Sequence, residues 1–204
     1  MSNRREFLQM SLAASALPVL AVQLEGAPPS RDRAAEQVQI DKVIVEMTSP
    51  LALAFGNEAI RLGLQPHGIT DDITDLWYKN LAPQWKQAPG VLAGVTLTTS
   101  LFCLELLAHD HGMRLWLKAI HNYLPNGDVE HQLRGSDPIV QQASAFGDGW
   151  APAFARLAAA PTILNSRECQ KRIVESLGTR AWESGPMVSW IIGPRLTNRP
   201  NQIS

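Results

Sequence analysis

The residues from Val95 to Leu133 constrain the fold most, because a helical pattern, a glycine, an alternating pattern and a turn follow one another directly. Apolar residues at helical spacing predict a helix over Val95–His111. Gly112 fits the left-handed position that ends a helix. The next segments predict, in order, a half-buried strand, a turn and a return strand: Met113–Tyr123, Pro125–Asp128 and Val129–Leu133. We expect this helix and hairpin to form the core of the fold.

Alternation within the first strand predicts which side chains share a face. One face is expected to carry the apolar residues Met113, Leu115, Leu117 and Ala119, and the other Arg114, Trp116 and Lys118. Asn126-Gly127 is the preferred pair for a two-residue hairpin loop, because both residues accept a positive φ. With such a loop, Tyr123 pairs with Glu130 and His121 pairs with Gln132.

These four hairpin residues are then expected to share one face. His121, Glu130 and Tyr123 combine an imidazole, a carboxylate and a phenol, a set suited to proton transfer or to binding a polar ligand. We take them as candidate catalytic residues, with a solvated hairpin tip as the structural alternative.

A metal site is the weaker alternative. Glu105 and His109 are four residues apart and lie on one helix face, so they are candidate metal ligands. His111 faces elsewhere on the helix, and His121 lies far along the next strand, so the four are not expected to converge. The structural interpretation of His109 and His111 is that they cap the carboxyl end of the helix.

Patterns elsewhere predict further elements of both kinds. Strands are expected over Lys42–Met47 and Met187–Ile192, with Ala88–Gly94 as a connecting turn. Helices are expected from Ser49-Pro50 to Leu62, Thr70 to Leu81, Asp137 to Phe146, Ala151 to Ala160 and Ser166 to Leu177. The expected fold class is α+β, with about six helices on a mostly antiparallel sheet of roughly four strands.

Composition excludes some functions. The 204 residues are 45% hydrophobic, carry a net charge of −1 and contain no run of basic residues, so a nucleic-acid partner is not expected. Glycine-rich phosphate loops, HExxH and haem-binding CxxCH are absent from the sequence, which leaves the cofactor unknown. Cys103 and Cys169 lack CxxC spacing; a disulfide is one alternative, and a buried free thiol at Cys103 is favoured.

The first residues carry a specific motif. Arg4 and Arg5 are followed by one variable residue and then by Phe7 and Leu8, and an uncharged, moderately apolar run continues to Ala21. This pattern resembles the twin-arginine (Tat) export signal. The run is too short for a membrane span, and small residues at Val19 and Ala21 predict cleavage after Ala21.

The resemblance implies export in the folded state by the Tat translocase to the periplasm, with no transmembrane anchor. Proteins on this route often hold a cofactor or travel with a partner that does, which favours an accessory or binding subunit of a periplasmic redox enzyme. A small stand-alone periplasmic enzyme or ligand-binding protein using His121 and Glu130 is the alternative. The remainder resembles only uncharacterised small Tat-signal proteins. The expected organisation is a signal peptide (1–21), a flexible lead-in (22–41), one domain (42–195) and a polar tail (196–204).

Overall fold

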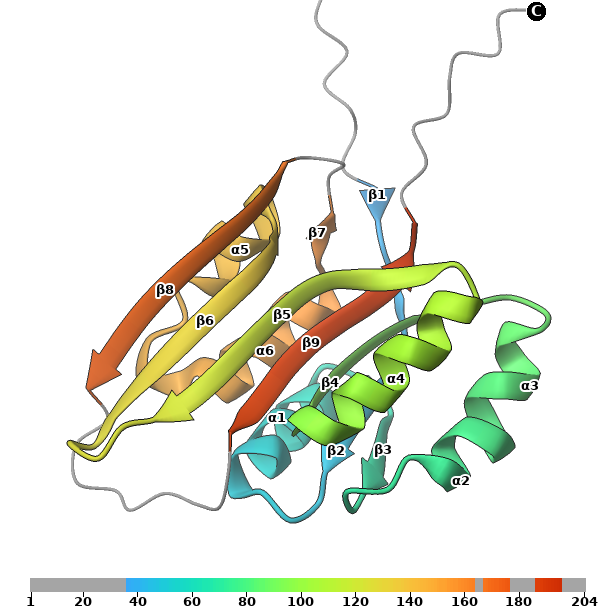
Figure 1. The fold of residues 1–204 in the computed structure, drawn as a ribbon, viewed down its shortest axis with the longest axis horizontal. Coiled ribbons are helices and arrows are strands. Elements are labelled where there is room, and N and C mark those ends of the chain that lie inside the picture. Colours follow the sequence, from blue (N-terminus) through green and yellow to red (C-terminus); the bar gives the residue numbers. More distant parts are fainter. Residues whose placement is uncertain (1–35, 164–166, 177–185, 196–204) are drawn as a thin grey trace, which may run out of the picture. The chain divides into compact units, whose positions relative to one another are not determined.

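Strands from distant parts of the chain form one central sheet. The computed structural model describes residues 36–163, 167–176 and 186–195, which belong to one compact unit, Ala35–Ser204. The sheet has seven strands in the order β3-β2-β4-β9-β5-β6-β8 (Figure 1). Their bounds along the chain are Ile40–Glu46 (β2), Pro66–Ile69 (β3), Val91–Leu97 (β4), Met113–Tyr123 (β5), Asp128–Ser136 (β6), Glu168–Ser176 (β8) and Met187–Pro194 (β9). β2 runs parallel to β3 and β4, and the remaining neighbours are antiparallel.

The expected sheet of about four mostly antiparallel strands is therefore wrong, although the fold still combines helices and strands. Three strands were not predicted: β3, β4 and β8. A separate short pair also forms between β1 (Glu36–Gln37) and β7 (Thr162–Ile163). The predicted start of the domain at residue 42 falls inside β2, which begins at Ile40.

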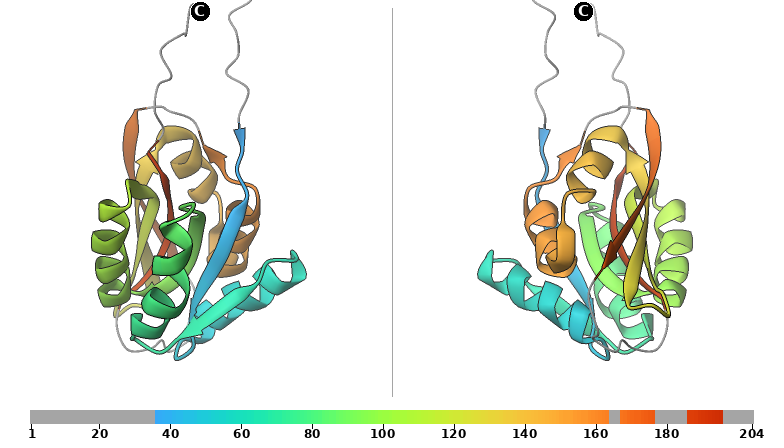
Figure 2. Two further views of the ribbon diagram at one scale, coloured as in Figure 1. Left: turned by 90° about the vertical axis from the view of Figure 1, so that its right-hand side faces the viewer. Right: turned by 90° about the vertical axis from the view of Figure 1, so that its left-hand side faces the viewer.

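Helices cover both faces of the sheet (Figure 2). In the described part of the chain there are five helical segments and one short 3-10 turn at 147–149, since α2, η1 and α3 continue without a break. The segments are α1 (Pro50–Arg61), α2–η1–α3 (Thr74–Leu76, Trp77–Leu81 and Ala82–Trp85), α4 (Thr98–Asp110), α5 (Asp137–Ala143) and α6 (Trp150–Ala159). One core contains residues of α1, α5 and α6, and the other contains residues of α2–α3 and α4.

The expected helix over Val95–His111 begins too early. Residues 91–97 form β4, and α4 starts only at Thr98. β4 is buried along almost its whole length between β2 and β9, so its side chains form a continuous apolar run without alternation. Such a run merges with a following apolar helix in the sequence, which explains the error. Gly112 does end the helix region as expected, with φ +70°.

The expected helix over Ser166–Leu177 is wrong as well. Glu168–Ser176 is β8, which pairs along its whole length with β6. Its side chains alternate in exposure, with Ile173 and Glu175 half-buried and Arg172 and Val174 exposed. Because polar residues occupy both faces of this strand, hydrophobic periodicity did not reveal it.

A register shift in β5 changes the expected faces of that strand. Pairing with β9 shifts between Leu115 and Leu117, so Met113 and Leu115 pack on the α4 side whereas Leu117 and Ala119 pack on the α6 side. The indole of Trp116, at the shift, donates its Nε1 hydrogen to the carbonyl of Pro194 at 3.0 Å.

The hairpin between β5 and β6 closes with three loop residues, Pro125 to Gly127, rather than two. Leu124 N–H donates to the Asp128 carbonyl at 2.8 Å, and Gly127 takes φ +84°. A turn followed by a left-handed glycine is the usual three-residue loop. The register therefore differs by one residue from the expected one, and His121 pairs with His131. A slip of one residue exchanges the two faces of a strand.

Candidate functional site

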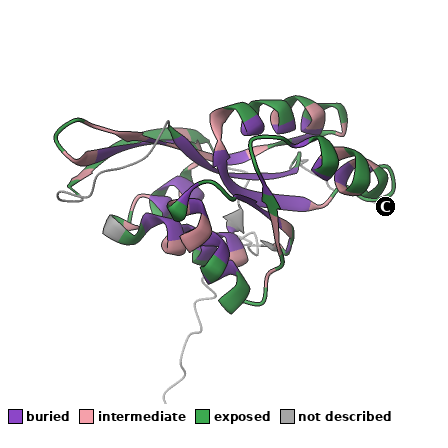
Figure 3. Ribbon diagram, turned by 90° about the horizontal axis from the view of Figure 1, so that it is seen from below, coloured by how far each residue is buried: buried purple, intermediate pink, exposed green. Residues whose placement is uncertain are grey.

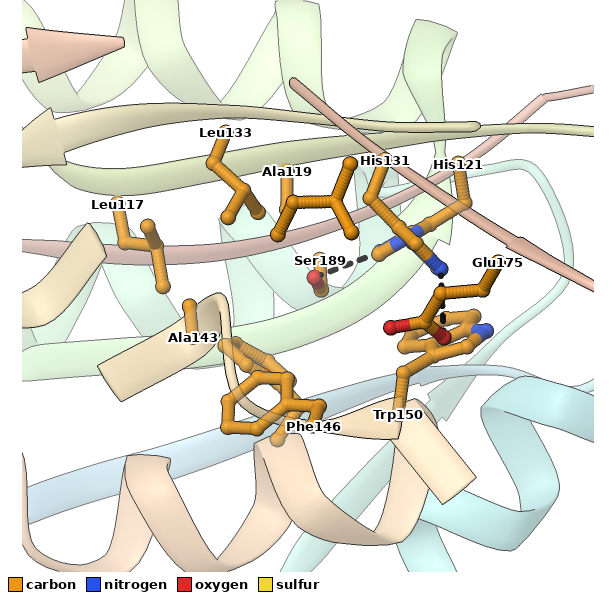
Figure 4. Close-up of a pocket in the computed structure, with 12 residues that line it drawn as sticks. Leu117, Ala119, His121, His131, Leu133, Ala143, Phe146, Trp150, Glu175 and Ser189 are labelled. Atoms are coloured by element: carbon orange, nitrogen blue, oxygen red, sulfur yellow. Dashed lines mark hydrogen bonds and ion pairs between the residues drawn. The ribbon is translucent and has the colours of Figure 1, made fainter. Parts of the chain in front are cut away.

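Four strands and one helix bring a buried polar group together on the α6 side of the sheet (Figure 4). His121 of β5 and His131 of β6 are directly paired, so their side chains share a face. Ser189 of β9 pairs with Ala119, two residues before His121 on that same face. Glu175 of β8 pairs with Val129, two residues before His131. Cross-strand and diagonal neighbours of this kind lie within reach of one another.

The four side chains follow one another in a series of close contacts. The Ser189 hydroxyl lies 2.8 Å from His121 Nε2. His121 Nδ1 lies 2.5 Å from His131 Nδ1. The series ends at Glu175, whose Oε2 is 3.4 Å from His131 Nε2, slightly beyond an ordinary hydrogen bond. A hydroxyl, two imidazoles and a carboxyl group are thus linked in one line.

Trp150, the first residue of α6, packs against the two histidines from the helix side. Its indole stacks on the imidazole of His121, with ring centroids 3.6 Å apart and an interplanar angle of 17°. The side chains of Ser189, His121, His131 and Trp150 are all at least 95% buried. The histidines are therefore confined by packing as well as by hydrogen bonds.

A small cavity opens beside the line. Apolar residues form most of its wall, namely Leu117, Ala119, Leu133, Ala143, Phe146, Phe154 and Ile173, and the polar group with Trp150 closes one end. The cavity volume is about 10 Å³, room for about one water molecule. It is an apolar pocket with hydrogen-bonding groups gathered on one side.

Burial keeps both histidines neutral at pH 7. Loss of solvent lowers the pKa of His121 well below its usual value, and the neighbouring His131 lowers that pKa further. Burial also lowers the pKa of His131 to about 4. A neutral imidazole donates at one nitrogen and accepts at the other, so the contacts between these rings do not require a charge.

The line of contacts allows a consistent set of donors and acceptors. With Glu175 as a carboxylate, His131 carries its hydrogen on Nε2 and accepts on Nδ1. His121 then donates from Nδ1, and its Nε2 accepts from the Ser189 hydroxyl. Every hydrogen in this arrangement points toward Glu175. If a bound molecule gives a proton to the Ser189 oxygen, each contact can shift one proton toward Glu175, so that the carboxylate is protonated and Ser189 remains a neutral hydroxyl. The group can therefore pass a proton between its two ends.

The predicted site residues separate. Tyr123 lies on the same face as His121, two residues further along β5, but Glu130 pairs with Asn122 and lies on the opposite face. There the Glu130 carboxylate accepts from Gln132 at 2.8 Å and forms an ion pair with Arg172. These partners, Gln132 first, lower the pKa of Glu130. The expected shared face of His121 and Glu130 is wrong because the loop has three residues.

Glu105 and His109 do line one cavity, of about 100 Å³, together with Arg114 and Arg195. His109 Nε2 lies 3.3 Å from Arg195 Nη2, and Glu105 approaches Lys118 at 3.9 Å. No group of three or more metal-ligating side chains converges within the described residues. At the histidine pair, moreover, Glu175 approaches the nitrogen of His131 that points away from His121. A shared ion would therefore have only two nitrogen ligands.

The predictions for His111, for the cysteines and for the export motif have different outcomes. His111 caps α4 as expected and packs against the indoles of Trp77 and Trp85. Cys103 is exposed rather than buried, and both cysteines are free. The export motif and cleavage position, residues 1–21, lie outside the described residues. Sequence reasoning missed His131, Glu175 and Ser189 as site residues. For His131, only the one-residue difference in loop length could have revealed the pairing.

Comparison with known proteins adds no assignment. The chain matches no protein-family model, no curated protein and no solved structure. No helix among residues 36–163, 167–176 and 186–195 is long and apolar enough to cross a membrane.

Proposed function

We propose that the protein binds a small molecule at the buried histidine pair and exchanges a proton with it. The supporting observation is the series of close contacts from Ser189 through His121 and His131 to Glu175, at one end of an apolar cavity. General acid–base chemistry needs a titratable group held in a fixed geometry next to the bound molecule. Stacking on Trp150 and burial supply that fixed geometry.

Proton transfer fits this site better than acyl transfer. Ser189 lies inside β9 between β4 and β5, so its backbone belongs to the ladder of the sheet. A serine nucleophile also needs N–H groups that point at the developing oxyanion. A serine in the middle of a central strand has no such free amide of its own. Ser189 is therefore assigned to orienting His121.

The cavity also defines the class of ligand. Its walls are mainly apolar, and the two imidazoles at its polar end are uncharged. An uncharged molecule with one hydrogen-bonding group therefore fits best. Such a ligand takes the place of the one water molecule that the cavity has room for, and a larger ligand requires the side chains of the wall to move aside.

Saturation-transfer NMR with small uncharged heterocycles and alcohols tests this proposal. We expect binding to the wild type, loss of binding in His131→Gln and Ser189→Ala, and unchanged binding in His109→Gln, a matched histidine on the other face of the sheet. Thermal melting checks that each variant is folded. Equal binding by folded His131→Gln and wild type would contradict the proposal, as would the absence of any binding.

A second candidate is an accessory subunit of a periplasmic redox enzyme. It is favoured by Tyr78, whose large aromatic side chain is 71% exposed on the helical segment between β3 and β4. Trp85 and Trp150 do not contribute to such a surface, because both are buried. Capture of a stoichiometric, cofactor-bearing protein from the periplasm by wild type but not by Tyr78→Ala supports this candidate, and capture of nothing counts against it.

Export itself rests on Arg4 and Arg5. We propose that they direct the folded protein to the periplasm, and replacement of both by lysine is expected to retain the precursor in the cytoplasm. Fractionation followed by immunoblotting measures this, with Arg31→Lys and Arg33→Lys as the matched control. Equal export of the two variants would contradict the proposal.

A further inference from the structure

A second cavity, which we call the α4 cavity, lies between the carboxyl end of α4 and the strands β5 and β9. Its volume is about 100 Å³, against about 10 Å³ for the cavity beside the histidines. The floor is apolar and consists of Ala108, Met113, Leu115 and Ile192. All of these except Leu115 are at most 1% exposed. Figure 3 shows the same division, with the central strands buried and the helices exposed on their outer sides. A cavity of this kind has room for the hydrocarbon part of a small ligand.

Charged and polar side chains form the rim of the α4 cavity. They are Glu105, His109, Arg114 and Arg195. The backbone N–H of Arg195 donates to the Gly112 carbonyl at 3.2 Å, and its Nη2 lies 3.3 Å from His109 Nε2. Because a guanidinium group can only donate, His109 Nε2 accepts in this contact. The two contacts hold the guanidinium group of Arg195 at the rim and leave its positive charge in place.

The charges of the two arginines have no carboxylate partner in the protein. Among residues 36–163, 167–176 and 186–195, no acidic side chain forms an ion pair with Arg114 or Arg195. A guanidinium group has several N–H donors, and His109 occupies only one donor of Arg195. The group that best matches the remaining donors is a carboxylate, which can accept two parallel hydrogen bonds.

The two acidic side chains near the rim have other neighbours. Glu105 approaches Lys118 at 3.9 Å, so its charge is met by a cation outside the cavity lining. Asp110 does not line the cavity, and its Oδ1 lies 4.0 Å from His109 Nδ1. Arg195 approaches the other nitrogen of that ring. The imidazole therefore separates Asp110 from the guanidinium group.

The carboxyl end of a helix carries a partial negative charge, which by itself disfavours an anion. At the end of α4, two of the carbonyl groups accept from the backbone amides of His111 and Gly112, each at 3.0 Å. These contacts and the guanidinium group of Arg195 offset the partial charge at the rim.

We propose that the α4 cavity binds a small organic carboxylate, with its apolar chain on the floor and its carboxylate paired with Arg195. An apolar cavity of about 150 Å³ holds a benzene molecule, so about 100 Å³ corresponds to a chain of about three or four carbon atoms. Arg114 supplies a second positive charge at the rim. The floor residues belong to the core on the α4 side of the sheet, so this site does not depend on the function proposed for the histidine pair.

Butyrate is a suitable probe, and two buried methionines report on the two cavities separately. Met113 lines the α4 cavity, whereas Met187 pairs with His121 on the other face of the sheet. The full chain, isotope-labelled in its methionine methyl groups, is titrated with butyrate and followed by NMR. The Met113 signal, assigned with Met113→Leu, is expected to shift until it saturates, and the Met187 signal is expected to stay in place.

Recognition of the charge is tested with butyramide, which has the same shape as butyrate but no charge. Butyramide is expected to bind at least about ten-fold more weakly, because it cannot form a charge-assisted pair with the guanidinium group. Arg195→Gln is expected to weaken butyrate binding by a similar factor. Arg61→Gln, which removes an exposed cation from α1, is the matched control and should leave binding unchanged. Thermal melting shows that each variant is folded.

Recognition of the apolar chain is tested by filling the cavity. Leu115→Phe places a larger side chain at the floor without changing any charge, and it is expected to abolish the shift that butyrate causes at Met113.

Three results would overturn the proposal. The first is a Met113 signal that butyrate does not move, including the case in which only the Met187 signal shifts. The second is equal binding of butyrate and butyramide. The third is equal binding of butyrate by folded Arg195→Gln and by the wild type.

Discussion

Polar side chains on the two faces of the sheet formed by β5, β6 and β8 differ in their partners and in their charge. On the α6 side, His121 and His131 are buried beneath Trp150, and both are held neutral. On the α4 side, Glu130 is held charged by Gln132 and Arg172, and the guanidinium side chain is 73% exposed. The difference shows how burial and the available partners together select the protonation state. A buried group whose partners are neutral loses its charge, whereas Glu130, itself only 6% exposed, retains its charge because of its side-chain donors and an exposed cationic neighbour.

Exchanging the two faces tests this comparison most severely. Deletion of Asp128, the first residue of β6, keeps the three-residue loop Pro125–Gly127 and places Val129 opposite Leu124, which favours a register slipped by one residue and would turn Val129 and Leu133 out of the core. Each of these side chains contributes about 1.5–3 kcal/mol through burial. We expect a loss of more than about 3 kcal/mol in urea unfolding. Replacement of Asp128 by asparagine, which keeps the number of residues in the hairpin, is the control and should change stability little.

Truncation of Trp150, whose indole stacks on His121, should have the next largest effect on the free energy of unfolding. Trp150→Ala is expected to lower the free energy of unfolding by about 3–5 kcal/mol, because it empties a fully packed site and exposes the histidine pair. Tyr78→Ala, at an exposed aromatic residue, should cost far less. Urea unfolding of both variants measures the difference. Similar losses of stability would show that Trp150 does not shield the histidine pair from solvent.

As the pH falls, stability is expected to decrease first through the buried histidines on the α6 side of the sheet. Unfolded His131 binds a proton near pH 6.5, whereas folded His131 does so only near pH 4, so the unfolded state holds more protons between these values. Stability is therefore expected to fall as the pH drops from 6.5 to 4, by about 3 kcal/mol for this residue alone. The depressed pKa of Glu130 acts in the same direction, but only as the pH falls below that carboxyl group's usual pKa of 4.5.

Substitution of the buried histidine checks which face is responsible. Urea unfolding at a series of pH values should show a flatter profile between pH 6.5 and 4 in His131→Gln than in the wild type. His109→Gln, at an exposed position on the other side of the sheet, should leave the profile unchanged. A wild-type profile that is flat over this interval would mean that the histidine pair is not kept neutral.

Loss of one hydrogen bond on the buried face should have a smaller effect. Ser189→Ala removes the hydroxyl that lies 2.8 Å from His121 Nε2 and leaves this nitrogen buried without its hydrogen-bond partner. The expected cost is about 1–3 kcal/mol in urea unfolding. Ser189→Thr restores a hydroxyl and should recover part of the loss, while no loss in the alanine variant would place the hydroxyl outside the series of contacts.

The smallest change in stability is expected for the ion pair between Arg172 and Glu130, on the face opposite the histidines. Arg172→Gln removes an exposed cation from its ion pair with Glu130, while Gln132 and Asn122 still donate to the carboxylate. The thermal midpoint is expected to change less than in any variant above, because the guanidinium group is 73% exposed and the other two donors still satisfy the buried carboxylate. A loss as large as that of Ser189→Ala would show that the two faces are more alike than the structure indicates.

Local signals in the sequence predicted the elements that depend on neighbouring residues. Ser49 caps α1 by accepting from the Ala52 amide at 3.2 Å, and Gly112 follows α4, both as expected. The sequence could not show the pairing of distant strands. Nothing local indicates that β9 lies between β4 and β5, or that β8 extends the sheet beyond β6. The site contacts made by Ser189 and Glu175 depend on those pairings.

The candidate site was predicted in part for the same reason. His121 was identified from a local pattern, but its partners depend on the loop length and on the long-range order of the strands. Asn126-Gly127 fits loops of two or of three residues, and only the packing of the α6 side against Val129, His131 and Leu133 decides between them.

The position of β9 has a consequence for biosynthesis. The last strand of the described chain lies near the centre of the sheet, with neighbours that were translated much earlier. While the ribosome still holds residues 187–194, β4 and β5 have no strand between them, and the sheet exists only as two incomplete halves. Each half exposes apolar edges that attract chaperones or other chains. Insertion of β9 joins the halves and carries Ser189 to the histidines, so a chain that stalls late in translation lacks both its central strand and its site.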